Sequence, residues 1–151
     1  MHRRLFLATV LSAAALAAAP GSAQSAPQVS VAKTPTCGCC TAWVEHMQEA
    51  GFEVETTDMT MTGLVARKTE LGVDPRLASC HTATVGGYVI EGHVPAADVR
   101  RLLAERPEAI GLAVPGMPVG SPGMEYGDRR DPYDTLLLLR DGGTRVFESH
   151  R

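Results

Sequence analysis

The sequence lacks any long run of basic residues, and outside its first residues the only adjacent arginines are the pairs Arg100-Arg101 and Arg129-Arg130. The chain carries 14 Lys and Arg residues against 17 Asp and Glu residues, and without Arg3 and Arg4 the balance is 12 against 17, a net charge of −5. This charge argues against nucleic acid and against an anionic membrane surface as partners.

The sequence also lacks an apolar run long enough to span a bilayer comfortably. Its one long apolar segment, LFLATVLSAAALAAAP, follows a charged start at residues 2–4 and precedes the small residues 21–23. We therefore predict that residues 1–23 are a secretory signal peptide cleaved after Ala23, and that the mature protein has no membrane segment. A retained anchor is the alternative, which the short length and the terminal Pro and Gly disfavour. No cysteine follows closely enough to indicate a lipoprotein.

Cysteines are few, and three of the four lie in one tetrapeptide. They are Cys37, Cys39, Cys40 and Cys80. An even number in an exported protein usually indicates a disulfide framework, but a bridge within the tetrapeptide would close a tiny loop and constrain the unfolded chain little. The 128 residues from 24 to 151 form one predicted domain that can bury a core without disulfides. These cysteines therefore indicate chemistry more than scaffolding.

The predicted elements follow the order β-α-β-α-β-β-α, then a Gly/Pro/Met loop and a terminal hairpin. Strands are predicted at 28–33, at 52–59 and twice within 83–92. Helices are predicted from the CGCC motif to Gly51, at 61–71 and at 95–106. An irregular loop is predicted at 111–127 and the hairpin at 134–149. The second helix is expected to bury Met61, Leu64, Val65 and Leu71. This order predicts an α/β fold with a thioredoxin-like mixed sheet.

In that fold the turn from the first strand to the first helix carries the functional cysteines. The loop before the third strand lies beside that turn. Here this loop is ASCHT, residues 78–82, so we expect Cys80 and His81 to lie near the CGCC motif.

Cys37 and Cys40 have C-x-x-C spacing at a predicted helix start, where free backbone N–H groups favour a thiolate. A thiolate is both a redox nucleophile and a metal ligand. Cys39 adds nothing obvious to dithiol exchange, whereas a soft metal ion such as Cu(I) gains from each further sulfur and tolerates shared sulfurs. The cysteines favour a site for one or more Cu(I) ions, and dithiol exchange and simple disulfides stay open.

Methionines and histidines add further candidate ligands. Met117 and Met124 lie in the Gly/Pro loop and not on a helix face. Their thioethers suit a soft metal, although a role in packing is equally compatible with the sequence. His81, next to Cys80, and His93, after the predicted strand pair, can be ligands or purely structural residues.

Four motifs together resemble one family. They are TPTCGCC, SCHTA, EGHVP and PGMPVGSPGME, and the resemblance to the CopG-type periplasmic copper-resistance proteins extends over roughly residues 29 to 126. The resemblance implies a thioredoxin-like fold, export to the periplasm and copper bound by Cys37, Cys39, Cys40 and Cys80, with the Met117–Met124 loop completing the site.

The predicted function is an exported copper-binding protein of copper resistance. It would sequester copper, hand it to another periplasmic copper protein, or convert Cu(I) and Cu(II) into each other; the sequence does not establish an enzyme activity. The alternative is a periplasmic thiol-disulfide oxidoreductase that uses Cys37 and Cys40.

Overall fold

The computed structural model describes residues 26–151. The predicted signal peptide, residues 1–23, lies outside them and stays a prediction. Within the described residues no helix combines the length and hydrophobicity that a membrane crossing needs.

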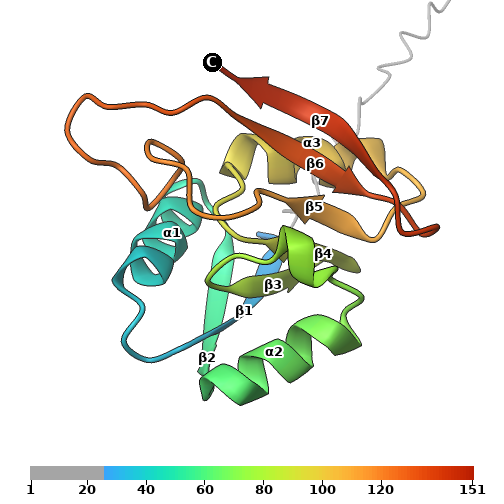
Figure 1. The fold of residues 1–151 in the computed structure, drawn as a ribbon, viewed down its shortest axis with the longest axis horizontal. Coiled ribbons are helices and arrows are strands. Elements are labelled where there is room, and N and C mark those ends of the chain that lie inside the picture. Colours follow the sequence, from blue (N-terminus) through green and yellow to red (C-terminus); the bar gives the residue numbers. More distant parts are fainter. Residues whose placement is uncertain (1–25) are drawn as a thin grey trace, which may run out of the picture.

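The described chain forms one mixed sheet and three α-helices (Figure 1). The strands are β1 (Gln28–Lys33), β2 (Glu53–Asp58), β3 (Thr82–Val85), β4 (Tyr88–Glu91), β5 (Gly111–Ala113), β6 (Tyr133–Leu138) and β7 (Thr144–His150). The helices are α1 (Gly38–Glu49), α2 (Met61–Glu70) and α3 (Ala96–Glu105), with a short 3-10 turn, Pro75–Leu77, between α2 and β3. The predicted elements are all present within one or two residues of their expected ends.

The seven strands lie in the order β2-β1-β3-β4-β5-β6-β7. β1 is parallel to β2, and β3 is antiparallel to both β1 and β4. This 2-1-3-4 arrangement is the predicted thioredoxin-like half of the sheet. β5, β6 and β7 extend it, with β5 parallel to β4 and the β6–β7 hairpin at the far edge.

The prediction of an irregular segment over 111–127 is wrong at its start. Gly111–Ala113 forms β5, which pairs with both β4 and β6. Gly111 can lie there because it has no side chain: a Cβ atom would be 1.8 Å from the Val89 carbonyl oxygen. Three buried residues without polar alternation carry no strand signal of their own.

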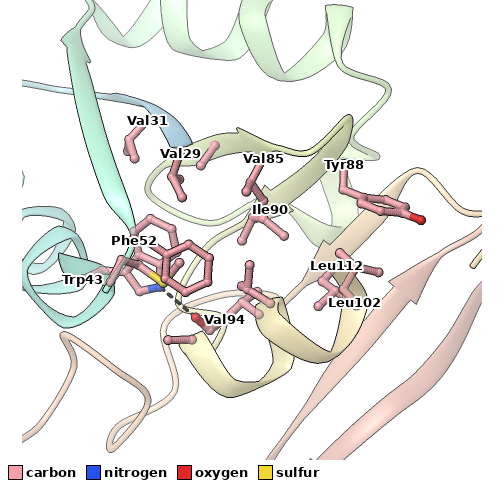
Figure 2. Packing of buried hydrophobic residues seen from close by; sticks show 14 of the residues in the cluster. Val29, Val31, Trp43, Phe52, Val85, Tyr88, Ile90, Val94, Leu102 and Leu112 are labelled. Carbon is pink, nitrogen blue, oxygen red and sulfur yellow. Dashed lines mark hydrogen bonds between the residues drawn. The ribbon is translucent and has the colours of Figure 1, made fainter. Parts of the chain in front are cut away.

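The two faces of the sheet are covered by different helices. Trp43 and Met47 of α1 and Val99 and Leu102 of α3 share one hydrophobic core with Ile90 of β4 (Figure 2). The Trp43 indole Nε1–H donates a hydrogen bond to the Val94 carbonyl at 2.9 Å, drawn as the dashed line in Figure 2. This bond fixes α1 against the segment that follows β4.

Helix α2 covers the opposite face with a buried side that differs from the predicted one. Met61 and Val65 are exposed, so their predicted place in the core is wrong. The buried residues of α2 are Leu64 and Lys68. Lys68 pairs with Glu91, which points away from the neighbouring Ile90 because successive strand residues face opposite sides.

The loop after β5, orange in Figure 1, packs on the start of α1. A Cβ atom at Gly123 would be 2.7 Å from the Cys39 carbonyl oxygen and 2.8 Å from the Trp43 amide nitrogen. Both neighbours are backbone atoms of α1, so neither can move aside without shifting the helix or the loop. Gly123 also has φ +85°, a conformation that favours glycine.

We predict that Gly123→Ala displaces this loop, whereas Gly127→Ala does not. Gly127 also has a positive φ, but a Cβ atom there would have no neighbour within 4 Å, so both variants share a backbone strain of about 1–2 kcal/mol. Gly123→Ala should lower the free energy of unfolding by about 1–3 kcal/mol more than Gly127→Ala does, because its Cβ atom adds an overpacking cost. Urea-induced unfolding of both variants measures the difference, and equal losses would contradict the contact.

Candidate metal centre

Four chain segments meet at one end of the sheet because of the strand register. Ala32 pairs with Thr82, Thr82 with Glu91, and Glu91 with Ala113. β4 and β5 end at this line, β3 begins there, and β1 ends one residue beyond it. The segments that continue from these residues therefore lie side by side, and they carry the cysteines, His81, His93 and the Met117–Met124 loop.

The CGCC motif forms the start of α1. Cys37 is the residue before the helix, and no side chain caps the free N–H groups of the first turn. Cys37 and Cys40 are joined by a disulfide, with their Cα atoms 5.3 Å apart. Cys40 is buried, and Cys37 is partly exposed. The positive end of the helix dipole at this turn favours the thiolate form of these sulfurs when the disulfide is reduced.

Cys39 and Cys80 are free thiols that connect the motif to the loop before β3. The Cys39 Sγ lies 3.5 Å from the Cys37 Sγ and 3.6 Å from the Cys80 Sγ. All four sulfurs lie within 4.8 Å of one another. The prediction that Cys80 and His81 approach the CGCC motif is confirmed.

A buried ion pair holds the backbone on both sides of Cys80. The Lys68 ammonium, on α2, contacts the Glu91 carboxylate and donates a hydrogen bond to the His81 carbonyl at 3.0 Å. The same Glu91 carboxylate accepts a hydrogen bond from the Ser79 amide at 2.6 Å. The charged side chains are 9% and 0% exposed, so Cys80 is positioned by a pair of charges that water barely reaches.

Two histidines flank Cys80 on its other side. The His93 Nε2 lies 3.0 Å from the Cys80 Sγ, and the His81 Nδ1 lies 3.4 Å from it. Both side chains are fully buried. Cys80, His81 and His93 form a second group of potential metal ligands that shares Cys80 with the four-cysteine group.

Burial dominates the ionisation of these residues. Burial, followed by the neighbouring Cys39, raises the pKa of the Cys80 thiol to about 12, so this thiol is protonated near neutral pH. Burial also lowers the pKa of His93, and burial with the nearby His93 and Lys68 lowers the pKa of His81 well below its ordinary value. Both imidazoles are therefore neutral near pH 7, the form that can bind a metal ion.

The two loop methionines flank points where the loop contacts the cysteine-bearing segments. Gly116, before Met117, accepts a hydrogen bond from the Ser79 hydroxyl through its carbonyl oxygen. Gly123, before Met124, lies against the first turn of α1. Met117 is exposed and Met124 is half-buried. The loop is thus anchored beside the sulfurs, and a ligand role for either thioether stays a prediction.

Comparisons with known proteins find similar chains that include these segments. A family model described as a protein of unknown function, DUF411, matches residues 77–124, which include Cys80, both histidines and the methionine loop. A solved structure of the copper resistance protein CopG, form 2, is 44% identical, with a TM-score of 0.78 over 83% of this chain and 99% of that one.

The form 1 structure of CopG matches at 44% identity with a TM-score of 0.76, over 82% of this chain and 96% of that one. The chain belongs to the CopG family. The predicted membership is confirmed, and so is the predicted mixed α/β fold. Among curated proteins no match is found. This CopG homologue therefore has a cysteine cluster whose donor atoms are close enough to hold a metal ion.

Sequence reasoning missed the buried Lys68–Glu91 pair and did not decide the place of the two histidines. The signal for the pair was weak: a lysine four residues after Leu64 on α2, and a glutamate that ends the otherwise apolar strand β4. Single histidines carry no periodic pattern, so their approach to Cys80 required the sheet register.

We predict that Lys68→Met lowers the free energy of unfolding by about 3–5 kcal/mol, because it leaves the buried Glu91 carboxylate without its countercharge. Urea-induced unfolding measures the loss.

Lys33→Met is the matched control. Lys33 pairs with Asp58 at 2.8 Å, but the Asp58 side chain is 55% exposed and can be hydrated when the lysine is lost. This variant should cost no more than about 1 kcal/mol. Similar losses in both variants would show that burial of the Lys68–Glu91 pair has no special cost.

Proposed function

We propose that this protein is an exported, periplasmic copper-binding protein of copper resistance that binds Cu(I) through Cys37, Cys39, Cys40 and Cys80. The observation that carries the proposal is the approach of all four sulfurs to within 4.8 Å of one another. The relatives are named as copper resistance proteins, which supports copper as the cargo.

The donor set suits Cu(I) better than Zn(II). Cu(I) prefers soft thiolates, accepts low coordination numbers and allows a sulfur to bridge two ions. A structural zinc site usually takes its ligand pairs from two separate turns. Here three sulfurs come from one turn and one from the neighbouring loop, a crowded arrangement that favours one or more Cu(I) ions with shared sulfurs.

Binding by all four cysteines requires the reduced protein. A disulfide sulfur is a poor metal ligand compared with a thiolate, and Cys37 and Cys40 are disulfide-bonded in the structure. Reduction by a dithiol adds two electrons and two protons to this bond and yields two thiols, which lose their protons when a metal binds. The bound copper ion would then be sequestered, transferred to another periplasmic copper protein, or converted between Cu(I) and Cu(II).

A thiol-disulfide oxidoreductase is the second candidate, because one observation favours it. The Cys37–Cys40 disulfide lies at a helix start, the position at which dithiol enzymes hold theirs. In that function Cys37 and Cys40 would exchange with a substrate disulfide, and Cys39 and Cys80 would have no necessary role.

We predict that the reduced protein competes with a colorimetric chelator for at least one Cu(I) ion per chain. Cys39→Ser and Cys80→Ser should each lower the Cu(I) affinity by at least about 100-fold, since loss of a ligand costs more than loss of its supporting residue, which costs 10- to 100-fold. Chelator competition under anaerobic conditions measures the affinity.

Thr41→Ser, on the exposed side of the same helix, is the control and should bind Cu(I) like the unchanged protein. The oxidoreductase is favoured instead if Cys39→Ser and Cys80→Ser bind copper normally while Cys37→Ser abolishes disulfide exchange.

The methionine loop should contribute auxiliary ligands. We predict that Met117→Leu or Met124→Leu weakens Cu(I) binding by about 10-fold, because leucine keeps the apolar volume and removes the thioether. Met61→Leu is the matched control, since Met61 is an exposed methionine on α2. Copper-edge absorption spectroscopy should show no change in the number of sulfur ligands for Met61→Leu. Unchanged Cu(I) affinity in both loop variants would contradict a methionine ligand and restrict the ligands to the cysteines.

A further inference from the structure

Helix α3 begins without a capping side chain of its own. The residue before it is Pro95, which makes no side-chain hydrogen bond, and Ala96 is its first residue. The first amides of a helix have no partner within the helix, so each needs an acceptor from elsewhere. The Ala96 amide has one on α1, because it donates a hydrogen bond to the His46 Nε2 at 3.1 Å. A histidine of a neighbouring helix therefore caps the start of α3.

This hydrogen bond fixes the protonation state of His46. An amide N–H can only donate, so the His46 Nε2 accepts through its lone pair, and the proton of the neutral ring is on Nδ1. A protonated imidazole carries hydrogens on both nitrogens and has no lone pair left to accept. The contact therefore exists only while His46 is neutral, and protonation would set two N–H groups against each other.

Burial outweighs the charges around the imidazole. Burial lowers the pKa of His46, and the carboxylates of Glu125 and Glu49 oppose it to a smaller extent. Glu49 is on α1, and Glu125 is in the loop after β5. On α3, the carboxylate of Asp98 contacts β6 and β7, and the Arg100 guanidinium lies over the ring of a core phenylalanine. No described group thus offsets the effect of burial on this ring.

Two helix ends act on the same imidazole in opposite senses. His46 lies in the last turn of α1, where a positive charge is favourable. Its Nε2 contacts the first amide of α3, where a positive charge is unfavourable. The pKa of His46 is lowered overall, so the neutral form that caps α3 prevails near pH 7.

A second hydrogen bond joins the same two segments. Trp43, one turn before His46 on α1, donates its indole N–H to the Val94 carbonyl at 2.9 Å (Figure 2). Val94 is two residues before Ala96, so α1 donates to this segment at one point and accepts from it at another. Trp43 is the single tryptophan of the chain and is fully buried. Its fluorescence therefore reports on the contact between α1 and the start of α3.

We propose that His46 is an acid-sensitive latch between α1 and α3. The neutral imidazole holds the first amide of α3, and protonation removes the acceptor and releases the start of α3 from α1. The latch contains none of the proposed Cu(I) ligands. The proposal therefore goes beyond the proposed function and is tested on the metal-free protein.

The direction of the pH dependence follows from linkage. A histidine whose pKa is lower in the folded protein than in the unfolded chain stabilises the fold fully above the unfolded value of about 6.5. That contribution is lost as the pH falls through the lower pKa of His46 in the folded protein. The latch should therefore be closed at neutral pH and open as the solution becomes acidic.

The first measurement uses the unchanged, metal-free protein in an NMR and fluorescence titration. The Ala96 amide signal, the His46 ring signals and the Trp43 fluorescence should change with one midpoint, below the ordinary histidine value of about 6.5. The protection of the Ala96 amide against hydrogen exchange, corrected for the intrinsic rate, should fall by about 10-fold, which corresponds to the loss of one net hydrogen bond. Different midpoints for the His46 ring and the Ala96 amide would overturn the latch.

Two substitutions at the same position separate the latch from packing. Glutamine places its Oε1 where the histidine Nε2 lies, can accept the Ala96 amide and does not titrate. His46→Gln should therefore keep the amide protected and abolish the acid transition. Asparagine is one bond shorter and reaches only the Nδ1 position, so His46→Asn should show about 10-fold lower protection at neutral pH as well. Equal protection in the two variants would contradict the capping bond.

His150→Gln is the matched control, because His150 is a second histidine that contacts α3, through the Asp98 carboxylate at 3.1 Å. This variant should keep the acid transition of the Ala96 amide. A transition that persists in His46→Gln, or that disappears in His150→Gln, would assign the pH dependence to another group and overturn the latch. The titration of the unchanged protein decides the question even where a variant fails to fold.

Discussion

The register of four neighbouring strands is the constraint on which the metal centre depends. Ala32, Thr82, Glu91 and Ala113 are paired in one line across β1, β3, β4 and β5. Thr82 begins β3, Glu91 and Ala113 end β4 and β5, and Ala32 is one residue from the end of β1. A shift of one residue in any pairing would turn that strand's side chains to the opposite face, and the loops would no longer bring their sulfur and nitrogen atoms together.

A buried ion pair and one hydrogen bond to the backbone hold in place the segments that the strand register brings together. The Lys68–Glu91 pair holds the residues before and after Cys80 from the α2 side, while the Trp43–Val94 hydrogen bond holds α1 to the segment after β4. Contacts on both faces of the sheet therefore hold the segments around Cys80. A buried ion pair contributes little to stability relative to apolar packing, so its main effect here is to position this loop.

Cys80 belongs to both groups of potential metal ligands, the four cysteines and the group with His81 and His93. Toward α1 its neighbour is the Cys39 sulfur, and its other neighbours are nitrogens of two buried imidazoles, His81 before β3 and His93 after β4. Sulfur and imidazole nitrogen atoms therefore both lie next to the Cys80 sulfur. The state of the Cys37–Cys40 disulfide decides how many thiolates are available. In the proposed function, reduction of this disulfide is therefore what makes all four cysteines available to Cu(I).

The sequence by itself determined the order of elements, the CGCC turn at the start of α1 and the approach of Cys80, because these follow from local periodicity and the known topology of a thioredoxin-like sheet. It misjudged Met61 and Val65, since apolar spacing on α2 did not reveal that Lys68 takes the buried position. It also missed β5, whose three residues are buried without alternation. Only the tertiary structure decided that His81 and His93 converge on Cys80 and that Glu91 finds a countercharge. The physical reason is that single polar residues leave no periodic trace in a sequence, and their partners are set by strand pairings between distant segments.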